Sequence, residues 1–370
     1  MHRPKPLSRA SIRRAAGAPF VPLVLGLLAA AAPARAQDST PDTPTAQDTA
    51  YAPGAYRVFT GAGEPATLDD VVAAMGDVDV VFVGETHDDP TGHMIEAELL
   101  RGADEAYGDD RPVALSLEFF QADAQPIVDE YLAGLITERS FRADARPWPR
   151  YETDYRPLVE YAKEHGLPVI AANAPRRYTT RVTLHGREAL EDLSPQARAF
   201  LAPLPYGTAS EAYRNQWIAV ISEVMEEEGM KCGIPVEELA AEGEEVRARA
   251  PMGSHGNMGN QLDAQVLWDA TMAWSIAKFL DREPDALVLH MVGGFHVERG
   301  TGTPEQLEMY RPGTTRLIVS MQPVDDVNVF EPAPAGEWGD FVVQTEKSRT
   351  LEEIECRRFL AGREAAAGGS

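Results

Sequence analysis

Residues 78–87 read VDVVFVGETH, and residues 286–296 read ALVLHMVGGFH. Each stretch is a short apolar run that ends in a Gly-x-x-His sequence, at residues 84–87 and 293–296. Apolar runs of this length, without polar alternation, are typical of strands buried on both faces of a parallel sheet. We therefore predict a parallel sheet in which two strands each lead into a glycine turn followed by a histidine.

Other apolar runs alternate with segments of helical spacing along the chain. Strand followed by helix, repeated, predicts right-handed crossovers, so the predicted fold class is α/β, with a mostly parallel central sheet flanked by helices. The predicted strands cover residues 78–83, 113–117, 167–171, 286–292 and 317–321, and the predicted helices cover residues 92–105, 126–136, 155–165 and 261–280.

Residues 194–258 interrupt this alternation. They are polar and helix-prone, with acidic runs at 226–228 and 237–245, which indicates a smaller helical lobe inserted into the α/β domain. The glycine-rich stretch at 251–259 is expected to be a loop. The predicted organisation is a signal peptide (1–36), a disordered acidic Thr/Pro-rich linker (37–55), the α/β domain (56–345) and a C-terminal tail (346–370).

The first 36 residues have the order of features found in a secretory signal peptide. Basic residues precede an apolar run at 20–32, and Ala34-Arg35-Ala36 forms a small-x-small cleavage site. This run is shorter than the ~20 apolar residues that span a bilayer, and no later run is longer, so no transmembrane segment is expected in the mature chain. No cysteine lies near the cleavage site, so we expect an exported periplasmic or extracellular protein without a lipid anchor. The Arg13-Arg14 pair leaves a twin-arginine route open.

The composition narrows the range of partners. The leader holds six of the 34 basic residues and no acidic ones, which leaves 28 basic against 58 acidic residues and a net charge of −30 after it. Such a charge argues against a nucleic-acid partner. The two cysteines, Cys232 and Cys356, could pair or remain separate thiols in an oxidising compartment.

Each predicted strand leads into polar or tightly turning residues. The carboxyl ends of parallel strands share one crevice, where ligands bind. Five such ends therefore predict one functional site, in which His87 and His296 face a common cavity. The sequences at these ends are GETH (84–87), EFFQ (118–121), NAPR (173–176), GGFH (293–296) and QP (322–323).

The residue types at this edge suit metal binding or proton transfer. Glu85 and His87 are two residues apart and can present a carboxylate and an imidazole on the same side; alternatively, Glu85 caps the next helix and His87 is bonded within a loop. Glu118 closes an apolar run, where a buried carboxylate needs a cation, a metal or a hydrogen-bond donor. Arg176 is the expected partner of Glu118 and could equally bind a ligand carboxylate.

The roles of four further residues are less closely defined by the sequence. His93, at the start of a predicted helix, could extend the cluster or cap the helix. Tyr178 could ligate haem iron through its phenolate. His290 lies inside a predicted strand, where a core histidine is expected, and Asp269 lies on a helix face from which it could orient the histidines at the strand ends.

With these residues identified, the chain resembles the ChaN family of haem-binding uptake proteins, which is grouped with the Tiki and erythromycin-esterase proteins. The resemblance implies haem binding for iron acquisition, with two haems held face to face between paired subunits, and hence a homodimer. In the wider superfamily, the positions of Glu85, His87, Glu118 and His296 are associated with hydrolysis. The similarity covers residues 78–345, and its most specific segments are GETHDDPTGH (84–93), LEFF (117–120), LPVIAANAPRR (167–177), QVLWDATMAWSIAKFL (265–280) and GGFHVERGTGTPEQL (293–307).

Two functional hypotheses follow. In the first, the protein binds haem: Tyr178 or a histidine at the strand ends ligates the iron, Arg176 or Arg177 pairs with the propionates, and His93 and Asn173 lie beside the cofactor. In the second, the protein is a metal-dependent ester or amide hydrolase. Its metal ligands would be His87, His296 and Glu85 around a divalent ion such as Mn²⁺ or Zn²⁺, and Glu118 would take part in catalysis.

Overall fold

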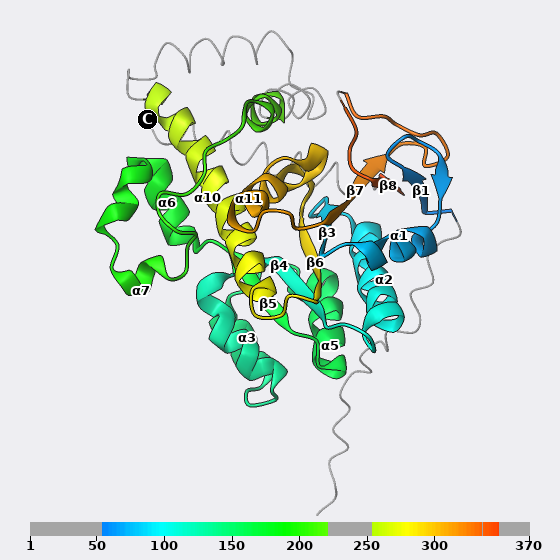
Figure 1. The fold of residues 1–370 in the computed structure, drawn as a ribbon, viewed down its shortest axis with the longest axis horizontal. Helices are drawn as coiled ribbons and strands as arrows, with labels where there is room; N and C mark the ends of the chain where they lie inside the picture. The colour runs from blue at the N-terminus through cyan, green and yellow to red at the C-terminus, as the bar shows by residue number, and fades with distance from the viewer. Residues whose placement is uncertain (1–53, 221–253, 335, 348–370) are drawn as a thin grey trace, which may run out of the picture. The chain divides into compact units, whose positions relative to one another are not determined.

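A sheet of eight strands forms the centre of the fold, in the order β2-β1-β8-β7-β3-β6-β4-β5 (Figure 1). The computed structural model describes residues 54–220, 254–334 and 336–347. The predicted signal peptide, nearly all of the linker, Cys232 and Cys356 lie outside these residues. The strands are β1 (Tyr56–Thr60), β2 (Pro65–Ala66), β3 (Val80–Glu85), β4 (Val113–Gln121), β5 (Val169–Asn173), β6 (Leu287–Gly293), β7 (Arg316–Val324) and β8 (Phe341–Glu346).

The strands from β8 to β5 are all parallel, which confirms the predicted α/β class. The five predicted strands correspond to β3, β4, β5, β6 and β7. β8 was not predicted from the sequence, and neither were β1 and β2, which extend the sheet antiparallel at one edge. These three strands are short, and β1 joins the sheet by pairing with β8, a contact between residues almost 300 positions apart, while β2 forms the edge.

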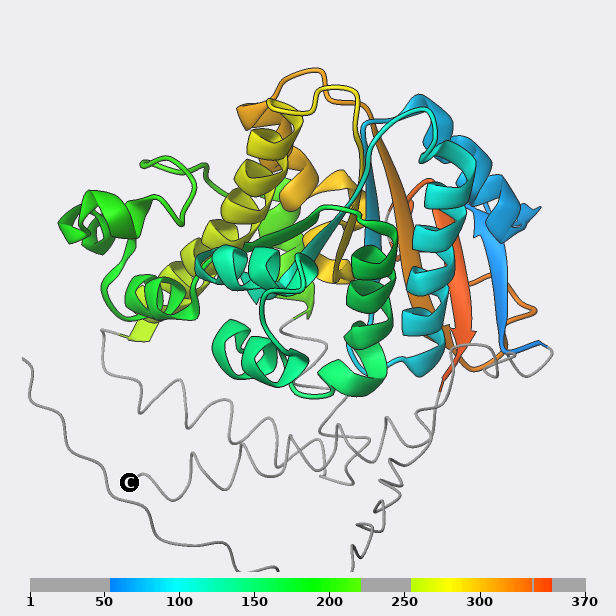
Figure 2. The ribbon, with the colours of Figure 1, turned by 90° about the horizontal axis from the view of Figure 1, so that it is seen from below.

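Helices cover both faces of the sheet because successive strand residues point to opposite sides (Figure 2). Val81 and Val83 of β3 face the helices on one side, whereas Val80 and Phe82 face α10 on the other. The helices are α1 (Leu68–Ala74), α2 (Pro90–Tyr107), α3 (Gln125–Leu132), α4 (Glu138–Ala145), α5 (Arg156–His165), α6 (Arg176–His185), α7 (Pro195–Arg198), α10 (Ser254–Leu280) and α11 (Thr303–Tyr310).

One helix prediction and one loop prediction need correction. The predicted helix over 126–136 ends at Leu132, because the chain turns at Gly134, whose φ of +70° suits glycine, before Thr137 caps α4. The glycine-rich loop predicted over 251–259 is wrong for residues 254–259, which form the first turns of α10. Glycine lowers helix propensity by only about 1 kcal/mol per residue, which a long helix that already packs on the sheet can absorb.

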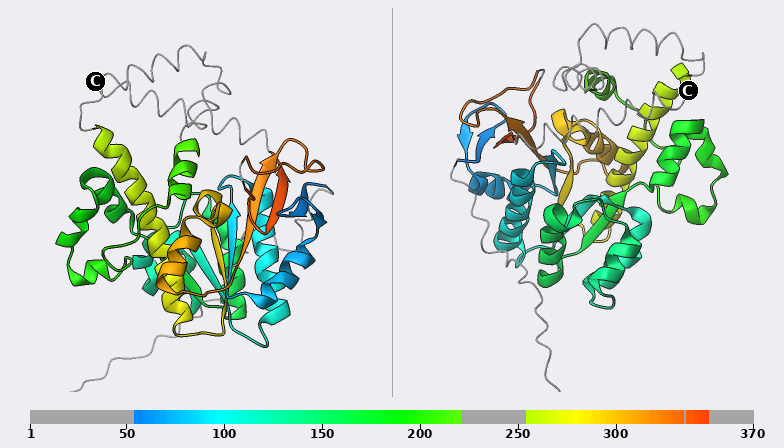
Figure 3. Two further views of the ribbon diagram at one scale, coloured as in Figure 1. Left: turned by 45° about the horizontal axis from the view of Figure 1, so that its top comes forward. Right: turned by 180° about the vertical axis from the view of Figure 1, so that it is seen from behind.

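The described part of the predicted lobe, residues 194–220, contains α7 and a helical segment at 211–220. It packs with α6 against α10 through a separate apolar cluster that includes Val182, Tyr213 and Leu267 (Figure 3). Residues 221–253 of the lobe lie outside the described residues. Within the described ranges, no helix combines the length and the apolar character needed to cross a membrane.

His290 lies in the middle of β6 and is fully buried. Its Nδ1 is 2.9 Å from the hydroxyl of Ser116 on β4, whereas its Nε2 has no hydrogen-bond partner among the described residues. Burial lowers the pKa of His290 to about 3. His290 is therefore a neutral core histidine, as predicted.

Candidate functional site

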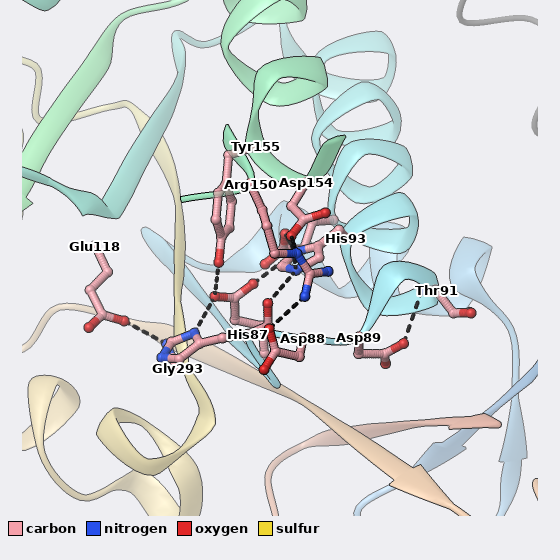
Figure 4. A network of polar contacts seen from close by, with 12 residues as sticks. His87, Asp88, Asp89, Thr91, His93, Glu118, Arg150, Asp154, Tyr155 and Gly293 are labelled. Atoms are coloured by element: carbon pink, nitrogen blue, oxygen red, sulfur yellow. Dashed lines mark hydrogen bonds and ion pairs between the residues drawn. The ribbon is translucent and has the colours of Figure 1, made fainter. Parts of the chain in front are cut away.

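The ends of β3, β4 and β6 bring His87, Glu118 and His296 together. Figure 4 shows His87, Glu118 and Gly293 of this group. One carboxylate oxygen of Glu118 accepts the backbone N–H of Gly293 at 2.8 Å, and the other is 3.7 Å from Nε2 of His296. A Cβ added at Gly293 would be 2.9 Å from Cε1 of His87 and 3.6 Å from the Glu118 carboxylate. The carboxylate of Glu118 therefore lies next to both imidazoles.

An irregularity in β4 places Glu118. The pairing of β4 with β6 ends at Leu117, and the register with β5 shifts between Leu117 and Gln121. A bulge of this kind redirects a side chain and frees it from the ladder. Glu118 can therefore turn toward the end of β6, although its side chain is buried.

Glycine is required where the two Gly-x-x-His turns meet. A Cβ on Gly84 would be 2.9 Å from Val297 and 3.0 Å from the backbone of Gly294, and a Cβ on Gly293 would press on the ring of His87. The absence of a side chain thus lets the two turns and the imidazole pack closely.

Glu85 orients His87. Its Oε1 is 2.7 Å from Nδ1 of His87 and accepts the hydroxyl of Tyr155 at 3.0 Å. Burial raises the pKa of Glu85, but the adjacent imidazoles of His87 and His93 outweigh burial and bring it to about 2. Burial lowers the pKa of His87, and Glu85 and Glu118 together raise it above its ordinary value.

The alternative role of Glu85 as a helix cap is wrong. The N-cap of α2 is Asp89, whose side chain accepts the N–H of Thr91 at 3.0 Å and whose other oxygen accepts the hydroxyl of Thr345. Glu85 is therefore left to contact the imidazoles.

A second carboxylate orients His296. Oδ1 of Asp269, on α10, is 2.8 Å from Nδ1 of His296 and accepts the hydroxyl of Thr303, while Tyr213 donates to its other oxygen. Burial lowers the pKa of His296, but Asp269 and Glu118 raise it to about 9. The predicted orienting role of Asp269 agrees with this geometry.

His93 extends the cluster instead of capping α2. Its Nδ1 is 2.9 Å from Oε2 of Glu85 and 3.1 Å from Oε2 of Glu96, and its Nε2 is 3.0 Å from the carbonyl of His87. Burial lowers the pKa of His93, but these carboxylates raise it to about 11; burial and the charge of Glu85 raise the pKa of Glu96 to about 8. Glu96 was not predicted from the sequence, although its position three residues after His93 on a predicted helix was a usable signal.

Trp148, Arg150 and Asp154 gave no sequence signal. The ring of Trp148 meets the ring of His87 edge-on, with centroids 4.9 Å apart. Arg150 pairs with Asp88 at 2.6 Å and with Asp154 at 2.7 Å. Trp148 and Arg150 also line a pocket of about 730 Å³ together with Pro147 and Tyr151 and with Arg139 and Arg142 of α4. Trp148, Arg150 and Asp154 belong to the segment between α4 and α5, and only the tertiary structure brings them near the end of β3.

Several predicted contacts differ in the structure. Arg176 is exposed and its backbone N–H binds Gln121, so the expected pairing of Arg176 with Glu118 is wrong; the Gly293 amide supplies the donor instead. Gln322 lies within β7, not after it, and donates to Glu298 at 2.7 Å.

The predicted cofactor residues on the β5 side form their own group. Arg177 pairs with Asp123 at 2.5 Å, and its guanidinium lies 4.4 Å from the ring centre of Tyr178. Asn173 is buried, and its side-chain oxygen accepts the N–H of Ala174. Within the described residues, no hydrogen bond or ion pair links Arg177 or Tyr178 to His87, Glu118 or His296.

One set of side chains has the spacing of metal ligands. Among the described residues, ligand atoms of Glu85, His93 and Glu96 lie within 4.8 Å of one another, and all three residues are buried. This set shares Glu85 with the predicted metal set of Glu85, His87 and His296.

Comparisons with known proteins agree with the fold. A solved structure of ChaN of Campylobacter jejuni, described by its cofacial haem binding, superposes with a TM-score of 0.54 at 12% identity, covering 79% of this chain and 97% of that chain. An erythromycin esterase superposes more weakly, with a TM-score of 0.38 at 11% identity over 79% of this chain and 83% of that one.

A curated relative, protein RETICULATA-RELATED 5, chloroplastic, of Arabidopsis thaliana, is 24% identical over 253 residues, which are 66% of this chain. The chain spans about a third of that relative's length, 31%. The profile of the family described as haem-binding uptake, Tiki superfamily, ChaN matches residues 71–307. That match extends over more than half of the chain and includes both Gly-x-x-His turns, and the chain therefore belongs to this ChaN family of the Tiki superfamily.

Proposed function

We propose that this protein binds haem and that His87 ligates the iron. The observation that carries this assignment is the exposure of His87: 48% of its side chain is accessible, against 7% for His296 and 3% for His93. Its Nδ1 is held by Glu85. Histidines that ligate metals usually bond a carboxylate through the other ring nitrogen, which fixes the ring and leaves Nε2 for the metal.

The pocket lined by Trp148 and Arg150 suits the rest of the haem; His87 is not among its lining residues but meets the ring of Trp148. Its volume of about 730 Å³ lies within the range of ~300–1,000 Å³ that is usual for small-molecule sites. Trp148 and Pro147 offer flat apolar surfaces, and Arg139 and Arg142 offer forked donors for propionates. Arg142 already pairs with Glu152, whereas Arg139 is exposed and has no ion pair within the described residues. Bound haem supplies the iron; the chain supplies the ligand, the apolar wall and the cations.

The proposal includes export and a role in haem or iron uptake. The order of basic, apolar and small residues over 1–36 supports export to the periplasm or beyond, and the family description supports uptake. The cofacial haems named for the Campylobacter protein support a homodimer as the binding form.

Haemin titration tests the proposal. The wild-type chain is expected to give a saturable, shifted Soret band, which His87→Ala should abolish and Tyr178→Phe should retain. A featureless wild-type titration would contradict haem binding. A titration that Tyr178→Phe abolishes and His87→Ala retains would transfer the ligand role to Tyr178.

A hydrolase is the second candidate, and the geometry of His296 favours it. Asp269 holds Nδ1 of His296, and Nε2 faces Glu118 at 3.7 Å. Asp269 and Glu118 raise the pKa of His296 to about 9, so its imidazole carries a proton on both nitrogens near pH 7. His296 would therefore act as the general acid, and Glu118 as the general base that activates water against an ester or amide. A divalent metal held by His87, His296 and Glu85 would instead activate water by lowering its pKa.

Ester hydrolysis by the purified chain, with and without added Mn²⁺ or Zn²⁺, tests this candidate. Activity that His296→Ala removes, while the haemin titration stays normal, would establish the enzyme. Absence of turnover under all metal conditions would count against it.

A further inference from the structure

We propose a buried divalent metal site formed by Nδ1 of His93, Oε2 of Glu85 and the carboxylate of Glu96. This site differs from the two Gly-x-x-His turns, because His93 and Glu96 both belong to α2 and neither His87 nor His296 supplies a ligand. The ion would be a first-row transition metal.

The tautomer of His93 is the first observation that indicates a metal ion. Nε2 of His93 lies 3.0 Å from the carbonyl oxygen of His87, which can only accept, so Nε2 must carry a proton. In a neutral imidazole Nδ1 then has a lone pair and no proton. That lone pair would face two carboxylates, at 2.9 Å from Glu85 and 3.1 Å from Glu96. A cation between the three atoms removes this conflict.

A second proton on His93 does not satisfy the cluster. A single N–H at Nδ1 can point at one acceptor, and its hydrogen bond goes to Oε2 of Glu96. Oε2 of Glu85 and Oε1 of Glu96 remain buried without a hydrogen-bond partner among the described residues. Buried carboxylate oxygens without a donor are costly, and a metal ion is one of the few groups that can satisfy both.

Neighbouring cations are already engaged. Arg150 pairs with Asp154 and Asp88, and Oε1 of Glu85 is occupied by His87 and Tyr155. The side chains of Glu85 and Glu96 are 2% and 0% exposed, so solvent does not screen their charges. Oε2 of Glu85 and Oε1 of Glu96 can therefore be satisfied only by a group that lies beside His93.

The distances suit a transition metal. Bonds of about 2.1 Å place adjacent ligand atoms of an octahedron about 3.0 Å apart, which matches the 2.9 Å and 3.1 Å separations from Nδ1 of His93. Carboxylates suit Mn²⁺ and imidazole suits Zn²⁺ or Fe²⁺, whereas Ca²⁺ and Mg²⁺ prefer oxygen ligands alone. The His87 carbonyl that bonds Nε2 is the kind of outer partner that orients a ligating histidine.

Metal binding to the full chain is the direct test. After a chelator and dialysis, calorimetric titration with Mn²⁺ should show one ion per chain, and Mn²⁺ should raise Tm in a way that chelator reverses. Absence of both binding heat and a Tm change with Mn²⁺ and Zn²⁺ would overturn the proposal, because the cluster would then hold a proton on a carboxylate in place of a metal ion.

A matched pair of variants locates the ion. Glu96→Gln should weaken Mn²⁺ binding by at least the ~10–100-fold that loss of an outer partner costs. Glu298→Gln, the same change at a glutamate that binds Gln322 and Ser320, should leave the affinity unchanged. Equal affinity of Glu96→Gln and the wild-type chain would overturn the assignment, as would equal losses in both variants.

Pulsed EPR of the Mn²⁺-loaded wild-type chain does not depend on a variant that folds. Coupling to one directly bound imidazole nitrogen is expected, and its absence would overturn the site. His87→Ala separates this inference from haem binding, because it should remove the haemin signal and keep this coupling. Coupling that disappears in His87→Ala would place the metal at the Gly-x-x-His turn instead.

Discussion

The carboxylate of Glu118 accepts the backbone N–H of Gly293 at 2.8 Å, and this bond ties the bulged end of β4 to the end of β6. Both partners are buried. The bond fixes the carboxylate next to the two histidines and satisfies an amide of β6 that lies beyond the last residue pair between β4 and β6. It therefore links the stability of the fold to the geometry of the candidate site.

Replacing Glu118 tests this link. Glu118→Ala should lower the free energy of unfolding by about 1–3 kcal/mol, because it leaves a buried amide without an acceptor. Glu118→Gln should cost less, since its amide oxygen can still accept the Gly293 N–H. Denaturant unfolding measures both. Equal losses in the two variants would show that the hydrogen bond does not contribute as described.

Gly293→Ala should move the ring of His87, because the new Cβ would lie 2.9 Å from its Cε1. The ring is the end of a half-exposed side chain and can shift, so we expect weaker haemin binding with little loss of Tm. Gly259→Ala is the control: nothing lies within 4 Å of its Cβ, and the helix should gain up to about 1 kcal/mol. Unchanged haemin affinity in Gly293→Ala would argue against His87 as the ligand.

Two tyrosines offer a matched comparison of buried hydroxyls. Tyr155→Phe removes the donor to Oε1 of Glu85 and should cost about 1.5–3 kcal/mol of unfolding free energy, as for hydrogen bonds to charged groups. Tyr151 is equally buried, but its hydroxyl has no partner among the described residues, so Tyr151→Phe should be neutral or stabilising. Chemical denaturation of the two variants checks the difference, and similar costs would refute it.

His290 predicts an acid-dependent loss of stability. Burial lowers its folded pKa to about 3, whereas an unfolded histidine titrates near 6.5, so between these values only the unfolded chain binds the proton. The free energy of unfolding should therefore decrease by about 1.4 kcal/mol per pH unit as the pH falls from 6.5 toward 4. The unfolding free energy of His290→Gln should change less steeply with pH over the same range, by the about 1.4 kcal/mol per pH unit that uptake of one proton contributes. Parallel slopes for the two chains would contradict a neutral His290.

The apolar runs and their endings were enough to predict five of the six parallel strands, all but β8, and the place of the candidate site. Val80 to Val83 has no polar alternation, so it had to be buried on both faces, and a parallel sheet puts its end beside the end of β6. This reasoning placed His87, Glu118 and His296 together without any knowledge of distances. The spacing along α10 also indicated Asp269.

Which atoms meet was decided by tertiary structure alone. Trp148 reaches His87 and Tyr155 reaches Glu85 from a segment more than 60 residues away, and no local pattern marks them. Arg176 and Glu118 seemed natural partners by charge, yet a bulge turned the carboxylate toward a backbone amide, which no periodicity reveals. Strand and helix patterns arise from interactions between near neighbours and from burial, so a sequence displays them. Side-chain pairing depends on bulges, loop paths and close packing, which exist only once the chain has folded.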